Sequence, residues 1–333
     1  EEPVEWVSEE PPGFETKNND SRKLLSVNNL QNPPYNLRGQ GFTAGIWDGG
    51  AVKYHEDLNY TGKTVLGEDN GVNYHAVHVA GTMLGGGKIN LGSGIPNRFR
   101  GVAYNSSLVS YDFNYADSTE LYNEMDESIT SYDSILSQNS WGYGIDSSNQ
   151  ELMGDYTGES ELYDKIVAGK TTEVSDNIPV IFAAGNEGDK HLFQYNTTTG
   201  PGATSKNTIT VGSVDENKNL ASYSSMGPTD DGRIKPTVVA LGVDFSTPGA
   251  LFSTIPSTNN AYPYGGIHGT SMAAPAVSGA VILLNQQFNQ TYRRLPEPAT
   301  VKGTLIHTAE DLGRKGPDYK YGWGLVNATK AVE

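Results

Sequence analysis

Short apolar runs alternate with segments of helical periodicity over most of the chain, and this alternation limits the fold more than any other feature. The predicted strands are residues 42–47, 108–113, 137–141, 178–184 and 208–214, and the predicted helices are residues 75–84, 118–136 and 271–288. The run 178–184 is apolar throughout, which is typical of a strand covered on both faces. Alternating strands and helices predict a three-layer α/β fold, with a mostly parallel central sheet flanked by helices.

The sequence contains no convincing linker within residues 37–333, which we therefore expect to form a single domain. Residues 1–36 differ from the rest because they are acidic and rich in proline and asparagine, and we interpret them as an arm that lies along the surface. The strongest helical pattern is at residues 271–288, where Val277, Val281, Leu284 and Phe288 fall on one face.

The chain of 333 residues is strongly acidic, with 39 Asp and Glu against 23 Lys and Arg and a net charge of −16. Such a surface repels phosphate backbones and anionic lipid headgroups, so neither nucleic acid nor a membrane is an expected partner. The longest mostly apolar stretch, residues 273–284, is shorter than the ~18 residues of a membrane-spanning helix. Cysteine is absent, which excludes thiol catalysis, thiolate metal sites and disulfides.

Three segments each carry one residue of a set that can activate a hydroxyl group. Asp48 follows the first predicted strand, His75 begins a short predicted helix, and Ser271 begins the strongest one. A serine hydroxyl needs a base within hydrogen-bond reach, and the base needs an acid that holds its tautomer. The chain order Asp, His, Ser is one of the known arrangements of that triad. Asn186, after the apolar run 178–184, offers an amide donor for the oxyanion of a tetrahedral intermediate.

The segments around these residues resemble the signature blocks of the subtilases, the subtilisin-like serine proteases. Residues 269–275 (GTSMAAP) resemble the nucleophile block, residues 183–188 (AAGNEG) the oxyanion block, and residues 78–82 (HVAGT) the end of the histidine block. Further likeness lies at residues 225–228 (SMGP), 231–236 (DGRIKP) and 321–324 (YGWG). The resemblance spans roughly residues 40–330.

The resemblance implies a subtilisin-like fold with the site at the carboxyl ends of the strands. It assigns Asp48 as the orienting acid, His75 as the general base, Ser271 as the nucleophile and Asn186 as the oxyanion donor. It further implies that Ser140-Trp141-Gly142 pairs with the backbone of an extended substrate and walls the pocket for the residue before the scissile bond.

Two departures from the family pattern bear on rate and substrate fit. Gly49 stands where the family usually has Thr or Ser after the acid, and Ala76-Val77 replace the usual Gly-Thr between the two histidines. His78, one turn after His75, is interpreted as a packed core residue, because the family's base is the first histidine of the pair. Asp57 resembles a position that often binds structural calcium, although its partner ligands are not identifiable in the sequence.

The expected function is that of a secreted, monomeric endopeptidase that acts on extended polypeptides and needs no cofactor for catalysis. Two alternatives remain open: an acyl-transfer macrocyclase of the same fold, and a peptide-binding pseudoprotease, for which the two departures are the only support. Whether a propeptide was cleaved before Glu1 is also open.

Overall fold

The computed structural model describes residues 17–53, 55–59, 63–88, 97–114, 117–190, 196–243, 251–255 and 264–333. Their central feature is a seven-stranded sheet in the order β2-β3-β1-β4-β5-β6-β7, and every neighbouring pair is parallel. The strands are β1 (Thr43–Asp48), β2 (Thr64–Leu66), β3 (Ser107–Asp112), β4 (Ser134–Asn139), β5 (Val180–Ala183), β6 (Ile209–Val214) and β7 (Val238–Leu241). An antiparallel hairpin, β8 (Leu251–Thr254) and β9 (Tyr264–Ile267), lies outside the sheet.

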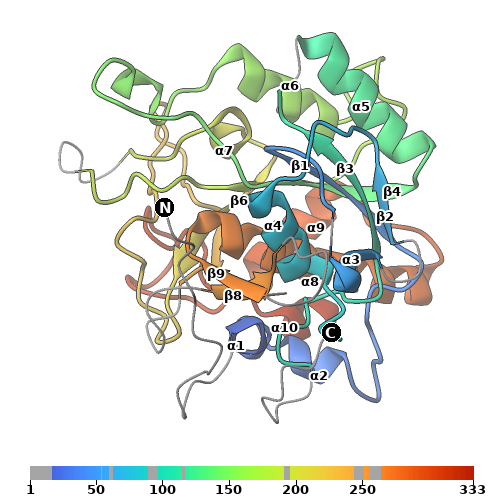
Figure 1. Ribbon diagram of the computed structural model, residues 1–333. Helices are drawn as coiled ribbons and strands as arrows, with labels where there is room; N and C mark the ends of the chain where they lie inside the picture. The colour runs from blue at the N-terminus through green and yellow to red at the C-terminus, as the bar shows by residue number, and fades with distance from the viewer. Residues whose placement is uncertain are drawn as a thin grey trace, which may run out of the picture.

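Helices cover both faces of the sheet, so the three-layer α/β prediction is confirmed (Figure 1). They are α1 (Lys17–Leu24), α2 (Val27–Leu30), α3 (Glu56–Asn59), α4 (Tyr74–Leu84), α5 (Ser118–Thr130), α6 (Gly158–Val167), α7 (Pro201–Thr204), α8 (Thr270–Tyr292), α9 (Pro298–Thr308) and α10 (Ala328–Val332). In Figure 1, α5 and α6 lie on one side of the sheet, and α4 and α8 lie on the other.

Two apolar clusters fill the spaces between these layers. Neighbouring residues of one strand point to opposite faces, so Ile46 belongs to the cluster under α4 and α8, whereas Trp47 belongs to the cluster under α5 and α6. The same division separates Ile181 from Phe182 on β5. Burial on both faces explains why β5 and β7 have continuous apolar sequences rather than alternating ones.

The structure differs from the predicted elements in several places, of which three bear on the site or the core. The predicted helix 118–136 is too long, because α5 ends at Thr130, Asp133 adopts a left-handed backbone with φ of 53°, and β4 begins at Ser134. The strands β2 and β7 were not predicted, because they have only three and four residues. The predicted arm is described from residue 17 onward, where α1 and α2 form and Leu25 and Leu30 join the core.

No helix among the described residues is long and apolar enough to cross a membrane. The helix with the strongest sequence pattern, α8, runs through the centre of the fold and packs against α4 and four strands of the sheet. Its N-terminal end and the carboxyl ends of the central strands place the residues of the candidate site.

Candidate active site

The first two residues of the predicted triad lie in direct contact. Asp48 is the last residue of β1 and is only 2% exposed, while His75 occupies the first turn of α4. The Nδ1 atom of His75 lies 2.8 Å from Oδ1 and 3.0 Å from Oδ2 of Asp48. This contact holds the tautomer in which Nδ1 carries the proton, which leaves Nε2 free to accept one.

The surroundings of Asp48 explain the glycine that follows it. Gly49 donates its N–H to Oδ1 of Asp48 at 2.7 Å, so the backbone itself orients the carboxylate. Asn73 caps α4 by accepting from the N–H of Ala76 at 3.0 Å, and it donates to the carbonyl of Gly49 at 2.9 Å. A Cβ atom at position 49 would lie 2.9 Å from Nδ2 of Asn73, so the side chain usual in the family would crowd this cap.

Ser271 is the second residue of α8 and is joined to Ser140 by two hydrogen bonds. Its Oγ donates to the carbonyl of Ser140 at 3.1 Å, and Oγ of Ser140 donates to the carbonyl of Ser271 at 2.9 Å. The second bond satisfies a carbonyl that helix geometry leaves without its donor, because Pro275, four residues later, has no N–H. The start of α8 is therefore fixed to the end of β4.

Asn186 follows β5 and is held by the residue before the serine. Its Oδ1 accepts from the N–H of Thr270 at 2.9 Å and from Oγ1 of Thr270 at 3.1 Å. A backbone N–H can only donate, so these bonds fix which amide atom is the oxygen and leave the NH₂ group available to a ligand. Glu187 accepts from the N–H of Asn186 at 2.7 Å and from Oγ of Ser225 at 3.2 Å, which anchors the loop.

Thr270, Glu187 and Ser225 are positioning residues that the sequence reasoning did not single out. All three lie inside segments that carried the family resemblance, so those segments already contained the signal. What the sequence did not reveal is their mutual contact, because the three residues come from separate parts of the chain.

The segment predicted to bind substrate begins where β4 ends. Ser140 is buried, and the ring of Trp141 stacks on Phe113 with 5.2 Å between ring centroids and packs edge-on against Phe182 at 5.3 Å. A Cβ atom at Gly142 would lie 3.0 Å from the carbonyl of Thr199, so a larger residue there would force the two chain segments apart.

The titration of His75 is set by opposing effects. Burial of the ring lowers its pKa, but the negative charge of Asp48 and the hydrogen bond to it act in the other direction and together prevail. The net pKa of His75 is raised from its ordinary value of 6.5. The ring remains 33% exposed at the side chain, so it can exchange protons with solvent.

We therefore expect kcat/KM to rise with pH through a single ionisation centred above 6.5, because only neutral His75 can accept a proton. The rise should shift to lower pH in Asp48→Asn, since that variant loses the charge that favours the imidazolium. Initial rates on one peptide substrate between pH 5 and 9 measure both profiles. Rates independent of pH across this range would contradict the role of His75 as base.

The two other predicted positions, His78 and Asp57, are both buried. His78 is fully buried on α4, as expected of a packed core residue. Asp57 is also fully buried, and its two oxygens accept from the N–H of Lys88 at 2.8 Å and from the hydroxyl of Tyr264 at 2.7 Å. These donors fit a structural carboxylate better than a calcium ligand, and calcium at Asp57 stays an untested prediction.

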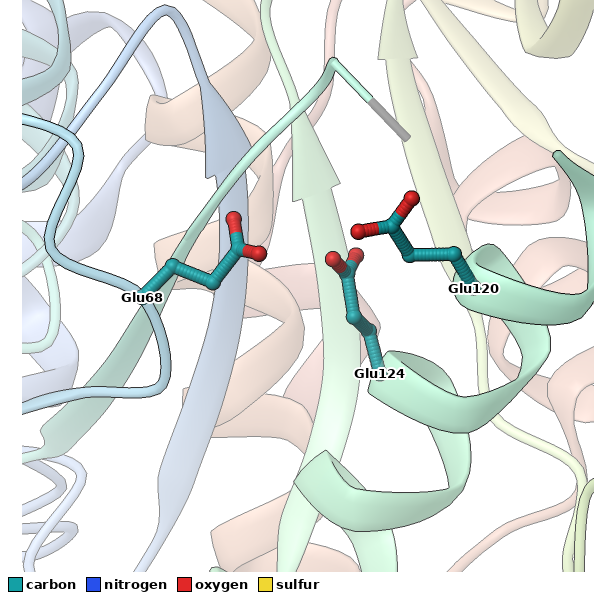
Figure 2. Close-up of side chains that lie close together, drawn as sticks. All are labelled: Glu68, Glu120 and Glu124. Carbon is teal, nitrogen blue, oxygen red and sulfur yellow. The ribbon is translucent and has the colours of Figure 1, made fainter. Parts of the chain in front are cut away.

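A cluster of three glutamates lies beside the carboxyl end of β3, and sequence reasoning missed it. Figure 2 shows Glu120 and Glu124 on successive turns of α5, with their carboxylates facing that of Glu68. One oxygen of each lies within 4.8 Å of the others, and a cavity of about 590 Å³ opens over them. Glu124 is 7% exposed and accepts from Nε1 of Trp47 at 2.8 Å. Burial, helped by the neighbouring negative charges, raises the pKa of Glu124 to about 8.

Glu124→Gln is expected to stabilise the protein at alkaline pH and to change its stability little at pH 5. Between the ordinary pKa of 4.5 and the folded value of about 8, the folded state holds a proton that the unfolded chain has released. The wild-type protein therefore loses stability as pH rises through this window. Above pH 8 the carboxylate of Glu124 is charged in the folded state, and its burial lowers the free energy of unfolding. After allowance for solvent screening, we expect a gain of roughly 1–3 kcal/mol at pH 9.

Urea unfolding midpoints at pH 5 and pH 9 measure this effect, with EDTA and a serine-protease inhibitor present throughout. The exposed Glu151→Gln variant is the matched control, because it removes the same charge from the surface. An equal gain at both pH values would show that Glu124 does not titrate in the window assigned to it.

Asp48, His75 and Ser271 all lie toward the carboxyl ends of the strands of a parallel sheet, and the serine begins a helix. One class of serine protease has this arrangement. Residues 39–324 match the profile described as the Subtilase family, and the chain belongs to this family. It is 31% identical over 318 residues to subtilisin DY of Bacillus licheniformis, which covers 93% of this chain and 97% of that protein.

Two further relatives have sequence identities close to that of subtilisin DY. Subtilisin of Bacillus pumilus is 33% identical over 309 residues, covering 89% of this chain and 94% of the relative. Subtilisin NAT of Bacillus subtilis subsp. natto is also 33% identical over 309 residues, covering 89% of this chain and 68% of the relative. The predicted family and the predicted enzyme class, a serine endopeptidase, are thus confirmed.

Proposed function

We propose that the protein hydrolyses peptide bonds through a triad of Ser271, His75 and Asp48 and an acyl-enzyme intermediate. The observation that carries the proposal is the contact between Nδ1 of His75 and both oxygens of buried Asp48, at 2.8 and 3.0 Å. This geometry supports His75 as a base whose Nε2 is free and whose ring is oriented by the carboxylate of Asp48. Membership of the subtilase family supports the same three roles.

In the proposed reaction, Oγ of Ser271 attacks the carbonyl carbon of the scissile bond and its proton passes to Nε2 of His75. The C–N bond then breaks, His75 returns the proton to the leaving amine, and an ester joins the acyl group to Ser271. Water attacks this ester as His75 takes one of its protons. The bond between the acyl carbon and Oγ then breaks and His75 returns the proton to Oγ, which releases a carboxylic acid and restores the serine. Before the first step, Oγ must turn from the carbonyl of Ser140, to which it donates in the described structure.

The oxyanion of each tetrahedral intermediate is proposed to accept from the NH₂ group of Asn186 and from the backbone N–H of Ser271. The bonds from Thr270 to Oδ1 of Asn186 support this role, because they direct the amide oxygen away from the developing charge. The second donor belongs to the first turn of α8, where backbone N–H groups have no helical partner. Hydrogen-bond donors that are already in position stabilise the oxyanion and lower the activation free energy, because the protein does not have to rearrange during the reaction.

The proposed substrate is an extended polypeptide that pairs with the backbone of Ser140-Trp141-Gly142. Burial of Ser140 and the packing of Trp141 between Phe113 and Phe182 support a rigid strand edge at this place. We further propose that the enzyme acts outside the cell as a monomer. No cofactor takes part in the proposed chemistry.

Digestion of an unfolded protein, followed by mass spectrometry of the products, tests the proposed reaction. Hydrolysis adds one water for every bond cut. The summed mass of the fragments should therefore exceed the mass of the parent protein by one water per cut. Products without the added water would indicate acyl transfer to an amine. An absence of products from folded enzyme would indicate a peptide-binding protein that does not cut.

A further inference from the structure

A hollow lined by positive charge lies at the edge of the sheet opposite the triad. Its main cavity, of about 550 Å³, is bounded by residues of α1, by residues 28–38, and by the segment 97–104. Arg38 precedes β1 and Arg100 precedes β3, so the cavity lies at the amino ends of strands whose carboxyl ends carry Asp48 and Asp112. Figure 1 shows α1 and α2 together at this end of the molecule.

Among the described residues, the lining of this cavity consists of three arginines, five side-chain amides and one tyrosine, and none of them carries a carboxylate. A second cavity of about 440 Å³ shares Asn97, Arg100 and Tyr104 with it and adds Lys63 and Lys88. No carboxylate occurs among the described residues that line it. Acidic residues outnumber basic ones by 39 to 23 in the whole chain. The described lining of the two cavities contains five basic side chains and therefore differs from the acidic composition of the protein. We call these two joined cavities the arginine hollow.

The hydrogen bonds that the structure describes for the guanidinium groups of the arginine hollow run to neutral acceptors. Arg22 is only 4% exposed, and its hydrogen bonds run to the side chain of Asn28 at 3.3 Å and to backbone carbonyls, including that of Asn97 at 3.2 Å. The Nε atoms of Arg38 and Arg100 are buried and have no hydrogen-bond partner among the described residues. Buried charged groups in proteins are normally paired or hydrogen-bonded, so these donors point to a missing partner.

The guanidinium group of Arg100 is held in place by Tyr104 and lies near that of Arg22. Its Cζ atom lies 4.0 Å from the ring centroid of Tyr104, which fixes the plane of the guanidinium. The carbonyl of Arg100 accepts from Arg22, so the two cations are held close together. Burial, followed by the charge of Arg100, lowers the pKa of Arg22 to about 9. An anion between these groups would relieve their mutual repulsion.

We propose that the arginine hollow binds a phosphate or sulfate group, either as the free ion or as an ester. The planar fork of arginine matches the oxygens of such groups in bidentate fashion. A divalent oxyanion compensates several neighbouring cations better than a single carboxylate does, and the amides offer donors and acceptors to hydroxyl groups around an ester. The volume of the cavity leaves room for a sugar-sized group beside the oxyanion.

Isothermal titration calorimetry on the full chain at pH 7 tests this proposal, with inorganic phosphate, inorganic sulfate, glucose 6-phosphate and unsubstituted glucose as probes at constant ionic strength in chloride. At least one of the three oxyanion probes should bind with a stoichiometry of one, and glucose alone should not. Equal affinity for phosphate and its sugar ester would identify the free ion as sufficient, whereas tighter binding of glucose 6-phosphate would identify the ester. Either result supports the hollow as an oxyanion site.

Variants of the hollow locate the binding. Arg38→Gln/Arg100→Gln should weaken binding at least tenfold, because it removes two charge-assisted partners. The double variant Arg38→Lys/Arg100→Lys keeps both positive charges but lacks the planar guanidinium groups that bind an oxyanion in bidentate fashion. It should weaken binding less than the glutamine variant does. The exposed pair Arg293→Gln/Arg294→Gln, at the far end of α8, makes the same change in net charge and should keep the wild-type affinity.

Peptidase activity reports that each variant is folded, because the hollow and the triad lie at opposite edges of the sheet. The proposal is overturned if none of the oxyanion probes shows saturable binding to the wild type. It is also overturned if the Arg38/Arg100 variants bind as tightly as the wild type, or if the Arg293/Arg294 control loses the same affinity.

Discussion

Replacing Ser271 with alanine is expected to lower kcat by about 10⁶-fold, the magnitude established for subtilisin itself. The variant keeps the backbone N–H of residue 271 and the amide of Asn186, so it can still bind substrate and polarise its carbonyl group. It lacks the atom that we propose forms the acyl-enzyme, so any remaining acceleration should come from binding and the proposed oxyanion donors. Steady-state hydrolysis of a chromogenic peptide, with long incubations for the variant, measures the loss.

Thr291→Ala is the matched control for this experiment. It removes a hydroxyl from an exposed position of the same helix, where Oγ1 of Thr291 donates only to the carbonyl of Gln287 at 3.0 Å. We expect its kcat to equal that of the wild type. A Ser271→Ala enzyme that kept more than about one hundredth of the wild-type rate would mean that another group is the nucleophile.

The second large effect is expected at Asn186. Asn186→Ala should lower kcat by about 10²–10³-fold with little change in KM, the magnitude established for the corresponding loss in subtilisin. The amide is proposed to donate to the oxyanion, which exists only during the reaction, so its removal should spare the binding of the ground state. Full Michaelis–Menten curves separate the two constants.

Asn186→Asp distinguishes the loss of the donor from the loss of packing. The aspartate retains an oxygen that accepts from the N–H and Oγ1 of Thr270, so the loop should keep its conformation. It has no N–H to offer and brings a negative charge toward the oxyanion. We expect a loss at least as large as that of the alanine variant. A normal kcat in either variant would remove Asn186 from the oxyanion site.

The elements that place the site were predictable because each is local in sequence. The strand that ends at Asp48 is a short, mostly apolar run before a glycine turn, and the long helix after Ser271 has a clear apolar face. Burial on both faces of the sheet produces the first pattern, and packing in the centre of the fold produces the second. The short strand β2 escaped prediction because its residues are partly exposed and too few to show a period.

The contacts that hold the site were not predictable, because they join segments far apart in the chain. The paired hydrogen bonds of Ser140 and Ser271 connect residues 131 positions apart, and they depend on the carbonyl that Pro275 leaves free. The close contact between Gly49 and Asn73 likewise depends on how the N-terminal end of α4 packs against the end of β1. The arginine hollow gave no sequence signal, since Arg22, Arg38 and Arg100 meet only after the strands have paired.

Labelling with a fluorophosphonate tests the central claim most directly, that Ser271 is the nucleophile activated by His75. Attack by Oγ on phosphorus displaces fluoride, and the proton leaves with it as HF, so one phosphonyl group should be added per chain. We predict that peptide mapping places this group on Ser271, in step with the loss of peptidase activity, and that His75→Ala is labelled far more slowly. Complete inactivation with the label on another residue, or full activity after Ser271 is labelled, would contradict the account.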